Sequence, residues 1–312
     1  MERFNNSEKK DLTYYKEMSK APNTKKSTDN WFKIYDAWAK LRGYCKQIFE
    51  YSPEELDKII QIFYVEIRKK DGSSYEPNCL NVMHSSLDRY LKIMGYKHSI
   101  VRDREFSESK SVLEGVARTL RGNGKGKRPN RSRSLTPEEE EILWAYGEFG
   151  SETPRALTQT IWWLISQHFG MRGRTEHHGI RIEDFLIESD ENGQEFLKFI
   201  EGMTKNQAGG LNHKARSVHP KMYSTGGDRC PVKLFKLFKF KRPISLRDSG
   251  PLYLGIIDNP KNSEIWYKKL PMGVHTIDGF MKNMVSRTPL KDVSKKFGNQ
   301  SARKTSKIYE SF

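Results

Sequence analysis

The sequence predicts a mainly α-helical protein with a small antiparallel β-hairpin sheet, an α+β fold divided into two domains. Three observations support this prediction. Apolar residues recur at helical spacing in four segments between residues 27 and 120. A cation-rich run without acidic residues follows at residues 121–133. Around residues 185–200 the apolar period changes to that of strands, and Asn192–Gly193 supplies a hairpin turn at the centre.

Composition points to a polyanionic partner. The 312 residues carry a formal net charge of +16 and 36% hydrophobic residues, a balance that favours binding to nucleic acid. The alternative, an acidic membrane surface, would need a basic amphipathic helix near an end, and none is evident. No apolar run is long enough to span a bilayer, and the N-terminus has no apolar signal core. Three scattered cysteines predict neither disulfides nor a zinc site, so we expect an intracellular protein without metal or cofactor.

The N-terminal half predicts a helical domain at residues 27–120, after a disordered basic tail at residues 1–26. Capping residues from Ser27 onward start the first helix, and Ser52–Pro53 starts the second. Glu76–Pro77 opens the third helix, and a weaker fourth helix spans residues 107–120. Short polar turns join the four helices, as in a small helical bundle.

Residues 121–135 predict a basic interdomain linker that contacts DNA phosphates. The run is rich in Gly, Pro and Ser and contains no acid. A solvated loop or a nuclear localisation signal fits its composition equally well. A nucleotide-binding P-loop does not, because the glycine spacing is one residue short. The predicted DNA-binding residues are Arg121, Lys125, Lys127, Arg128, Arg131 and Arg133.

Residues 136–312 predict the second domain. A helix starts at Thr136–Pro137, and a buried helix around Trp162 ends at Gly170. The hairpin is followed by a third strand within residues 215–223 and by a basic helix after Cys230. Further helices are expected at residues 276–285 and from residue 299 onward, and the segment around residues 266–267 is expected to be irregular.

Two arginine clusters in this domain suggest a phosphate site. The helix that ends at Gly170 leads directly into Arg172 and Arg174, and a second basic cluster occupies residues 299–305. Arginine is planar, permanently charged and able to hold two phosphate oxygens at once. On local pattern alone, cations that complement a helix C-terminus are an equally good interpretation.

These motifs resemble those of tyrosine recombinases. Gly170-Met171-Arg172 is similar to their Gly-Leu-Arg, Met203-Thr204-Lys205 after a strand resembles their hairpin lysine, and Gln300-Ser301-Ala302-Arg303 resembles their His-x-x-Arg. The fuller strings look most like the Crypton-derived, transposon-derived domains of eukaryotic zinc-finger MYM-type and glutamine-rich QRICH-type nuclear proteins. The resemblance covers roughly residues 27–312, and its specificity comes from the combination of motifs.

The resemblance implies a helical SAM-like core-binding domain at 27–120 and a recombinase catalytic domain at 136–312. It further implies a nuclear, metal-independent DNA strand transferase for DNA recombination and integration on double-stranded DNA, with assembly into oligomers on the DNA left open. Arg172 and Arg303 would clamp a phosphate, and Lys205 would protonate the leaving hydroxyl. Glu176 would support Arg172 from behind, and Arg174 is a rival for the clamp.

Two departures predict a catalytically degenerate protein. Gln300 stands where the family has histidine, and an amide carries no charge and transfers no proton. Tyr309 lies too close to Arg303 along one helix to attack the phosphate that Arg303 holds. We therefore expect a DNA-binding recombinase fold, truncated at its C-terminus. The alternatives are an active recombinase whose nucleophile lies beyond this chain, and a nuclear scaffold that binds proteins. The sequence predicts no zinc role for His177 and His178, which are expected at the surface or in hydrogen bonds.

Overall fold

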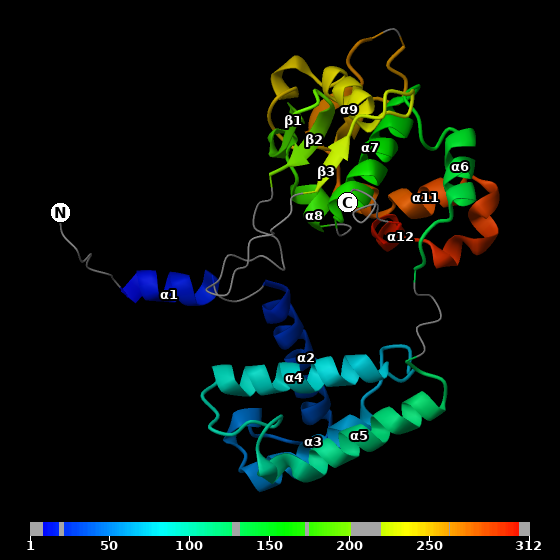
Figure 1. Ribbon diagram of the computed structural model, residues 1–312. Coiled ribbons are helices and arrows are strands. Elements are labelled where there is room, and N and C mark those ends of the chain that lie inside the picture. The colour runs from blue at the N-terminus through cyan, green and yellow to red at the C-terminus, as the bar shows by residue number, and fades with distance from the viewer. Residues whose placement is uncertain are drawn as a thin grey trace, which may run out of the picture. The chain divides into compact units, whose positions relative to one another are not determined.

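The computed structural model describes residues 9–18, 22–126, 132–171, 175–200, 220–261 and 263–305. The chain divides into two compact units, Met1–Pro129 and Asn130–Phe312, each with its own apolar core (Figure 1). Helices predominate and the sheets are small and antiparallel, so the predicted α+β class is confirmed in this form. Within the described residues, no helix has both the length and the apolar character needed to cross a bilayer.

Unit 1 is all helical. Its core is formed by apolar side chains of α2, α3, α4 and α5, among them Tyr35, Phe63 and Leu87. Proline in the first turn begins α3 and α4, and the Ser52 and Glu55 side chains form a capping box at the start of α3. The helices are α1 (Lys9–Met18), α2 (Pro22–Leu41), η1 (Ile48–Glu50), α3 (Pro53–Glu66), α4 (Pro77–Ile93), η2 (Arg104–Phe106) and α5 (Ser107–Gly122).

The predicted disordered tail at residues 1–26 is corrected by the helix at Lys9–Met18 and by the start of α2 at Pro22. The residues from Ser27 onward do not cap this helix, because they lie inside it. The Thr28 hydroxyl donates to the carbonyl of Thr24 one turn earlier, at 3.0 Å. The Ser27 hydroxyl lies 3.3 Å from that of Ser86 on α4. Contact with α4 therefore gives these capping-type residues tertiary partners within a longer helix.

Unit 2 combines helices with two sheets. The three-stranded sheet has the order β1-β2-β3 and lies beside α7 and α9 (Figure 1). Its helices are α6 (Pro137–Ala145), α7 (Pro154–Phe169), α8 (Thr175–Gly179), η3 (Ile182–Asp184), α9 (Pro231–Phe240), η4 (Ile244–Leu246), α10 (Val274–Asp278), α11 (Phe280–Ser286), η5 (Pro289–Lys296) and α12 (Asn299–Lys304). Its strands are β1 (Phe185–Ser189), β2 (Glu195–Phe199), β3 (Lys221–Tyr223), β4 (Leu254–Ile256) and β5 (Tyr267–Pro271).

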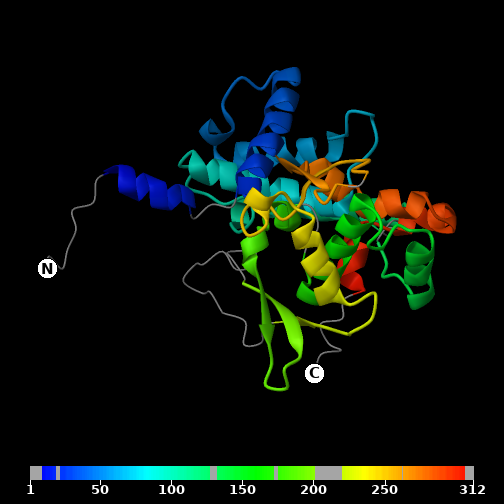
Figure 2. The same ribbon diagram turned by 90° about the horizontal axis from the view of Figure 1, so that it is seen from above.

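The predicted hairpin is present as β1 and β2. Phe185 pairs with Phe199 and Ser189 with Glu195, and the Asn192–Gly193 turn lies between the strands. In Figure 2 the hairpin projects from the helices of the unit, with its turn at the free end. The third strand is Lys221–Tyr223, whereas residues 215–219 of the predicted strand lie outside the described residues.

A second hairpin, β4–β5, occupies the segment that was expected to be irregular. Its register shifts between Leu254 and Ile256, and this irregularity obscures the alternation that identifies a strand. Tyr267 is 1% exposed, and its hydroxyl lies within hydrogen-bonding distance of the Thr158 hydroxyl on α7. Burial against α7 therefore defines this strand more than local pattern does.

Helix α7 is the centre of unit 2, as the sequence predicts. The Thr153 side chain caps its first turn, and Trp162 and Trp163 are both fully buried. The helix ends at Gly170, whose φ of 63° lies in the left-handed region that favours glycine. Met171 then packs into the core. This ending fixes the point from which the chain proceeds to Arg172.

Candidate functional site

Helix α12 presents two of the predicted site residues on one face. Asn299, Ser301 and Ala302 are buried, whereas Gln300 is exposed and Arg303 is half-buried. Residues three apart lie on the same side of a helix, so Gln300 and Arg303 share its outer face. The spacing of the Gln-Ser-Ala-Arg motif therefore places Gln300 and Arg303 on one side of the helix.

The inner face fixes the position of α12. The Asn299 side chain donates to the carbonyl of Ile277 at 2.8 Å and accepts from the backbone N–H of Met281 at 3.3 Å. Ala302 packs into the core of unit 2, and the helix lies against α7 and α11. A six-residue helix is too short to be stable alone, so these contacts determine where its outer face points.

Arg303 has no hydrogen bond or ion pair with any other residue that the structure describes. Most other cations of unit 2 differ in this respect; for example, Arg229 pairs with Glu141 at 2.5 Å and Lys236 with Glu195 at 2.6 Å. Because Arg303 has no acidic partner among the described residues, its guanidinium donors are available for an external anion.

Helix α8 follows the other predicted arginines in the sequence. Arg172 and Arg174 themselves lie outside the described residues. Met171 before them is buried, and His177 after them is 1% exposed. The described residues Met171 and His177, before and after these arginines, are therefore both part of the buried interior. Glu176, the predicted support for Arg172, is half-buried at the start of α8.

His177 is bound through both ring nitrogens. Its Nε2 lies 2.9 Å from the hydroxyl of Ser166 on α7, and its Nδ1 lies 2.9 Å from the hydroxyl of Tyr253. The Ser166 hydroxyl donates its hydrogen to the carbonyl of Trp162 at 2.8 Å. It must therefore accept from Nε2–H, which leaves Nδ1 to accept from Tyr253. Burial lowers the pKa of His177 to about 3, so the imidazole is neutral.

Both histidines were expected at the surface or in hydrogen bonds. His177 is buried and hydrogen-bonded, and His178 is exposed. Sequence reasoning assigned no function to Ser166 or Tyr253. The only sequence signal was a hydroxyl on the apolar face of the Trp162 helix. Ser166 joins α8 to α7, and Tyr253 joins α8 to the residue before β4.

The end of the predicted linker is part of unit 2. Arg133 forms a bidentate pair with Glu139, with N–O distances of 2.6 and 2.5 Å, and its guanidinium lies 4.5 Å from the centre of the Phe297 ring. This pairing lowers the pKa of Glu139. The backbone N–H of Leu135 donates to the Thr305 hydroxyl at 3.0 Å, and the Lys304 ammonium donates to the carbonyl of Ser132. Both ends of unit 2 are thus joined beside α12.

The predicted linker boundaries, 121–135, are corrected accordingly. Arg121 is exposed in the last turn of α5, and Lys125 lies 3.8 Å from Glu76 of its own unit. The Gly126 N–H also donates to Glu76, at 2.7 Å. Lys127, Arg128 and Arg131 lie outside the described residues. Ion pairs and hydrogen bonds therefore attach the start of the predicted linker to unit 1 and its end to unit 2. The composition of the linker does not reveal these contacts.

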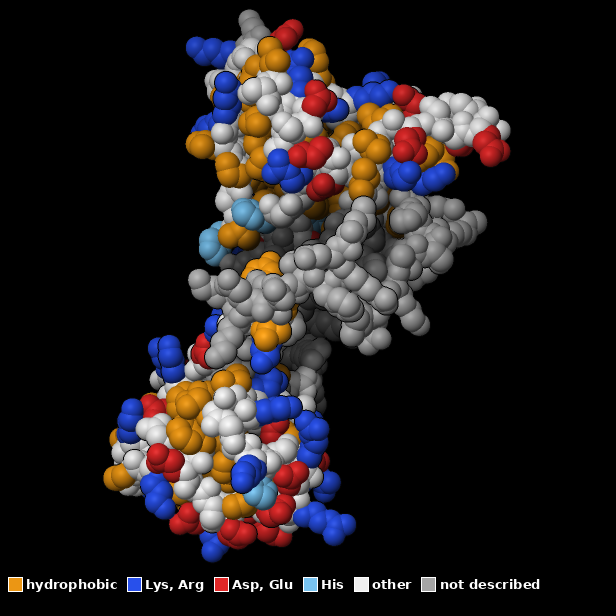
Figure 3. Space-filling model, turned by 90° about the vertical axis from the view of Figure 1, so that its left-hand side faces the viewer, with side chains coloured by type: hydrophobic (Ala, Val, Ile, Leu, Met, Phe, Trp, Pro, Cys, Tyr) orange, Lys and Arg blue, Asp and Glu red, His pale blue; other side chains and the backbone are white. Residues whose placement is uncertain are grey.

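Lys205, the predicted general acid, also lies outside the described residues, as does Tyr309. On the face shown in Figure 3, Lys and Arg side chains alternate with Asp and Glu on each unit and do not gather into one patch. The net positive charge is therefore dispersed there. On this face, single cations are spread among acidic side chains.

Comparison with known proteins adds a family match. Residues 134–287 match a family described as "Domain of unknown function (DUF3504)". The chain is 24% identical over 280 residues to the human "Uncharacterized protein KIAA1958", covering 87% of this chain and 39% of that protein. It is 22% identical over 218 residues to the human "Transcriptional regulator QRICH1", covering 66% of this chain and 27% of that protein. The chain is therefore similar to both human proteins over long stretches of its sequence.

A further relative is the human "Zinc finger MYM-type protein 2", which is 22% identical over 259 residues. The match covers 76% of this chain and 18% of that protein. The chain spans about two-fifths of the length of KIAA1958 and a smaller share of the other two relatives. Two of these relatives are thus named as a transcriptional regulator and as a zinc finger protein.

Proposed function

We propose that this protein is a nuclear DNA-binding protein whose unit 2 holds a phosphate of double-stranded DNA without cleaving the strand. In this proposal Arg303 contacts the phosphate oxygens, and Gln300 donates a neutral hydrogen bond beside it. Arg172 or Arg174 completes the clamp from the segment between Met171 and α8. The unpaired, half-buried guanidinium of Arg303 on a firmly positioned helix carries the proposal.

The recombinase-like fold and the transposon-derived origin belong to this proposal, and the resemblance of the three motifs supports them. Lys205 would lie near the same phosphate if the resemblance holds. Gln300 argues against strand transfer, because its amide cannot supply the charge of a histidinium to the transition state. The name of one relative, a transcriptional regulator, favours a transcriptional role over recombination.

The direct test is duplex binding by the Arg303→Ala variant. Charge-assisted hydrogen bonds contribute about 1.5–3 kcal/mol each, so the affinity should fall roughly tenfold or more at low salt. The slope of log affinity against log salt should flatten by about 0.9, as expected for one lost phosphate contact. Lys268→Ala, which removes an exposed charge from β5, is the matched control and should change both quantities less. If both variants changed the affinity and the salt slope equally, Arg303 would contribute only through the net charge of the protein and not through a specific phosphate contact.

A second experiment tests the absence of strand transfer. Duplexes that carry a nick beside many candidate sites trap covalent tyrosine intermediates, which denaturing gels reveal. We expect no protein–DNA adduct. An adduct that disappears in Tyr309→Phe would identify an active recombinase, and it would overturn the non-covalent part of the proposal while leaving the phosphate contact in place.

A further inference from the structure

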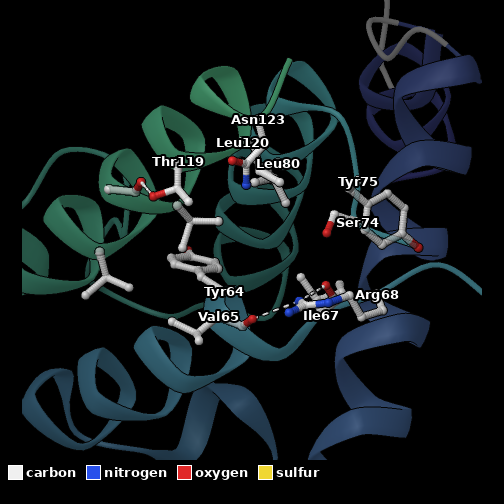
Figure 4. Close-up of a pocket in the computed structure, with 13 residues that line it drawn as sticks. Tyr64, Val65, Ile67, Arg68, Ser74, Tyr75, Leu80, Thr119, Leu120 and Asn123 are labelled. Atoms are coloured by element: carbon white, nitrogen blue, oxygen red, sulfur yellow. Dashed lines mark hydrogen bonds between the residues drawn. The ribbon is translucent and has the colours of Figure 1, made fainter. Parts of the chain in front are cut away.

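A pocket of about 440 Å³ opens between α3, α4 and α5 of unit 1 (Figure 4). Its lining lies within residues 64–123 and includes none of the residues proposed to hold the DNA phosphate. Ligand pockets have volumes of about 300–1,000 Å³, so this one has room for a small organic molecule.

The interior of the pocket is apolar. Tyr64 and Leu80 are almost fully buried and form its floor, and the half-buried side chains of Val116 and Leu120 form a wall on α5. The Tyr64 hydroxyl lies 2.6 Å from Nδ1 of His84 and is satisfied there. Tyr64 therefore offers the pocket its aromatic ring, a surface suited to another apolar or aromatic group.

Gly115 keeps the α5 wall open. A Cβ atom built at this position would meet no atom within 4 Å, so the missing side chain adds to the space of the pocket. Glycine inside a helix costs about 1 kcal/mol relative to alanine. Gly115 does not have the positive φ that would require glycine. Its backbone conformation therefore does not require glycine, and a larger side chain here would extend into the pocket.

One fixed cation lies at the pocket. Nη1 of Arg68 donates to the carbonyls of Val65 and Ile67, each at 2.8 Å, and these bonds hold the guanidinium at the end of α3 (Figure 4). Arg68 has no carboxylate partner within the described chain. The side chains of Ser74 and Asn123 also line the pocket and form no hydrogen bond to a described residue. A guanidinium edge offers two parallel donors, which match the two oxygens of a carboxylate.

We propose that this pocket binds a small organic carboxylate with an apolar or aromatic body. The body lies against Tyr64, Leu80 and Val116, and the carboxylate accepts from the guanidinium of Arg68. Ser74 and Asn123 supply further polar contacts at the rim. This site does not depend on the proposed phosphate site, and it gives the helical unit a binding function of its own.

The test uses 4-phenylbutyrate as the probe and the neutral alcohol 4-phenylbutanol as its matched control. Amide NMR spectra of the full chain should show saturable shifts at Gly115 and Thr119 with the acid. Binding of the alcohol should be at least about tenfold weaker, since a hydrogen bond to a charged group contributes that much. Arg68→Gln should remove the difference between acid and alcohol.

Two variants at one position test the pocket itself. Gly115→Leu should fill the space and abolish the shifts, whereas Gly115→Ala should preserve them, and both residues favour the helix more than glycine does. Thermal unfolding of each variant confirms that it folds. Equal binding of acid and alcohol, shifts that survive Gly115→Leu, or the absence of shifts at millimolar probe would each overturn the proposal.

Discussion

The hydrogen bond from Tyr253 to His177 should be measurable in the stability of unit 2. Tyr253→Phe removes the hydroxyl that donates to Nδ1 at 2.9 Å and leaves the ring in place. His177 is 1% exposed, so water cannot replace the lost donor. An unsatisfied buried acceptor costs about 1–3 kcal/mol. At roughly 2–4 °C per kcal/mol for a unit of this size, the melting temperature should fall by about 2–12 °C.

Calorimetry of the full chain is the assay, and Tyr146→Phe is its control. Tyr146 is 56% exposed, so removal of its hydroxyl should change the free energy of unfolding by less than about 0.5 kcal/mol. Nitrogen NMR of His177 tests the same bond directly and should show the proton on Nε2. A proton on Nδ1, or equal effects of the two Tyr→Phe variants, would refute the network and the anchoring of α8 to α7.

Three further outcomes are expected. Burial lowers the pKa of His177 to about 3 and that of His84 to about 4, whereas the pKa of histidine in an unfolded chain is about 6.5. Below pH 6.5 the unfolded chain therefore binds more protons than the folded protein. The free energy of unfolding should therefore fall by about 1.4 kcal/mol per pH unit for each histidine as the pH drops from about 6.5 to 5, and a flat urea-unfolding profile would contradict this. Limited trypsin digestion should cut between residues 126 and 132, because the flanking residues are hydrogen-bonded within their own units; early cleavage elsewhere would contradict the two-unit division. Neutralising the linker cations should flatten the salt dependence of duplex binding by about 0.9 per lost phosphate contact, and an unchanged slope would make the run a spacer or a nuclear signal. The cations to change are Lys125, Lys127, Arg128 and Arg131.

Local pattern predicted the elements whose structure depends on short-range chemistry. Proline and capping residues located the starts of α3, α4 and α6, and Gly170 located the end of α7. The predicted last helix that carries Arg303 is present as α12. These features follow from the helical period and from backbone preferences, which a sequence displays directly.

Features that depend on distant partners were not predicted. The sequence suggests that Arg133 is a free linker cation, but in the structure its guanidinium pairs with Glu139. The guanidinium also lies over the ring of Phe297, which is far along the chain. The role of Ser166 depends on its contact with His177, 11 residues further along the chain. His177 in turn contacts Tyr253, which lies 76 residues beyond it. The β4–β5 hairpin was missed because its register is irregular and its stability comes from burial against α7.

The most direct test of the central claim is a double-mutant cycle between Arg172 and Arg303. Duplex affinity at low salt is measured for the wild type, Arg172→Ala, Arg303→Ala and the double variant, after thermal unfolding has shown that all four fold. If both guanidiniums hold one phosphate, each single change weakens binding roughly tenfold or more. The double variant should then lose clearly less than the sum of the two free-energy changes. Strictly additive losses would place the arginines on separate phosphates, and unchanged affinity in both single variants would contradict the phosphate site.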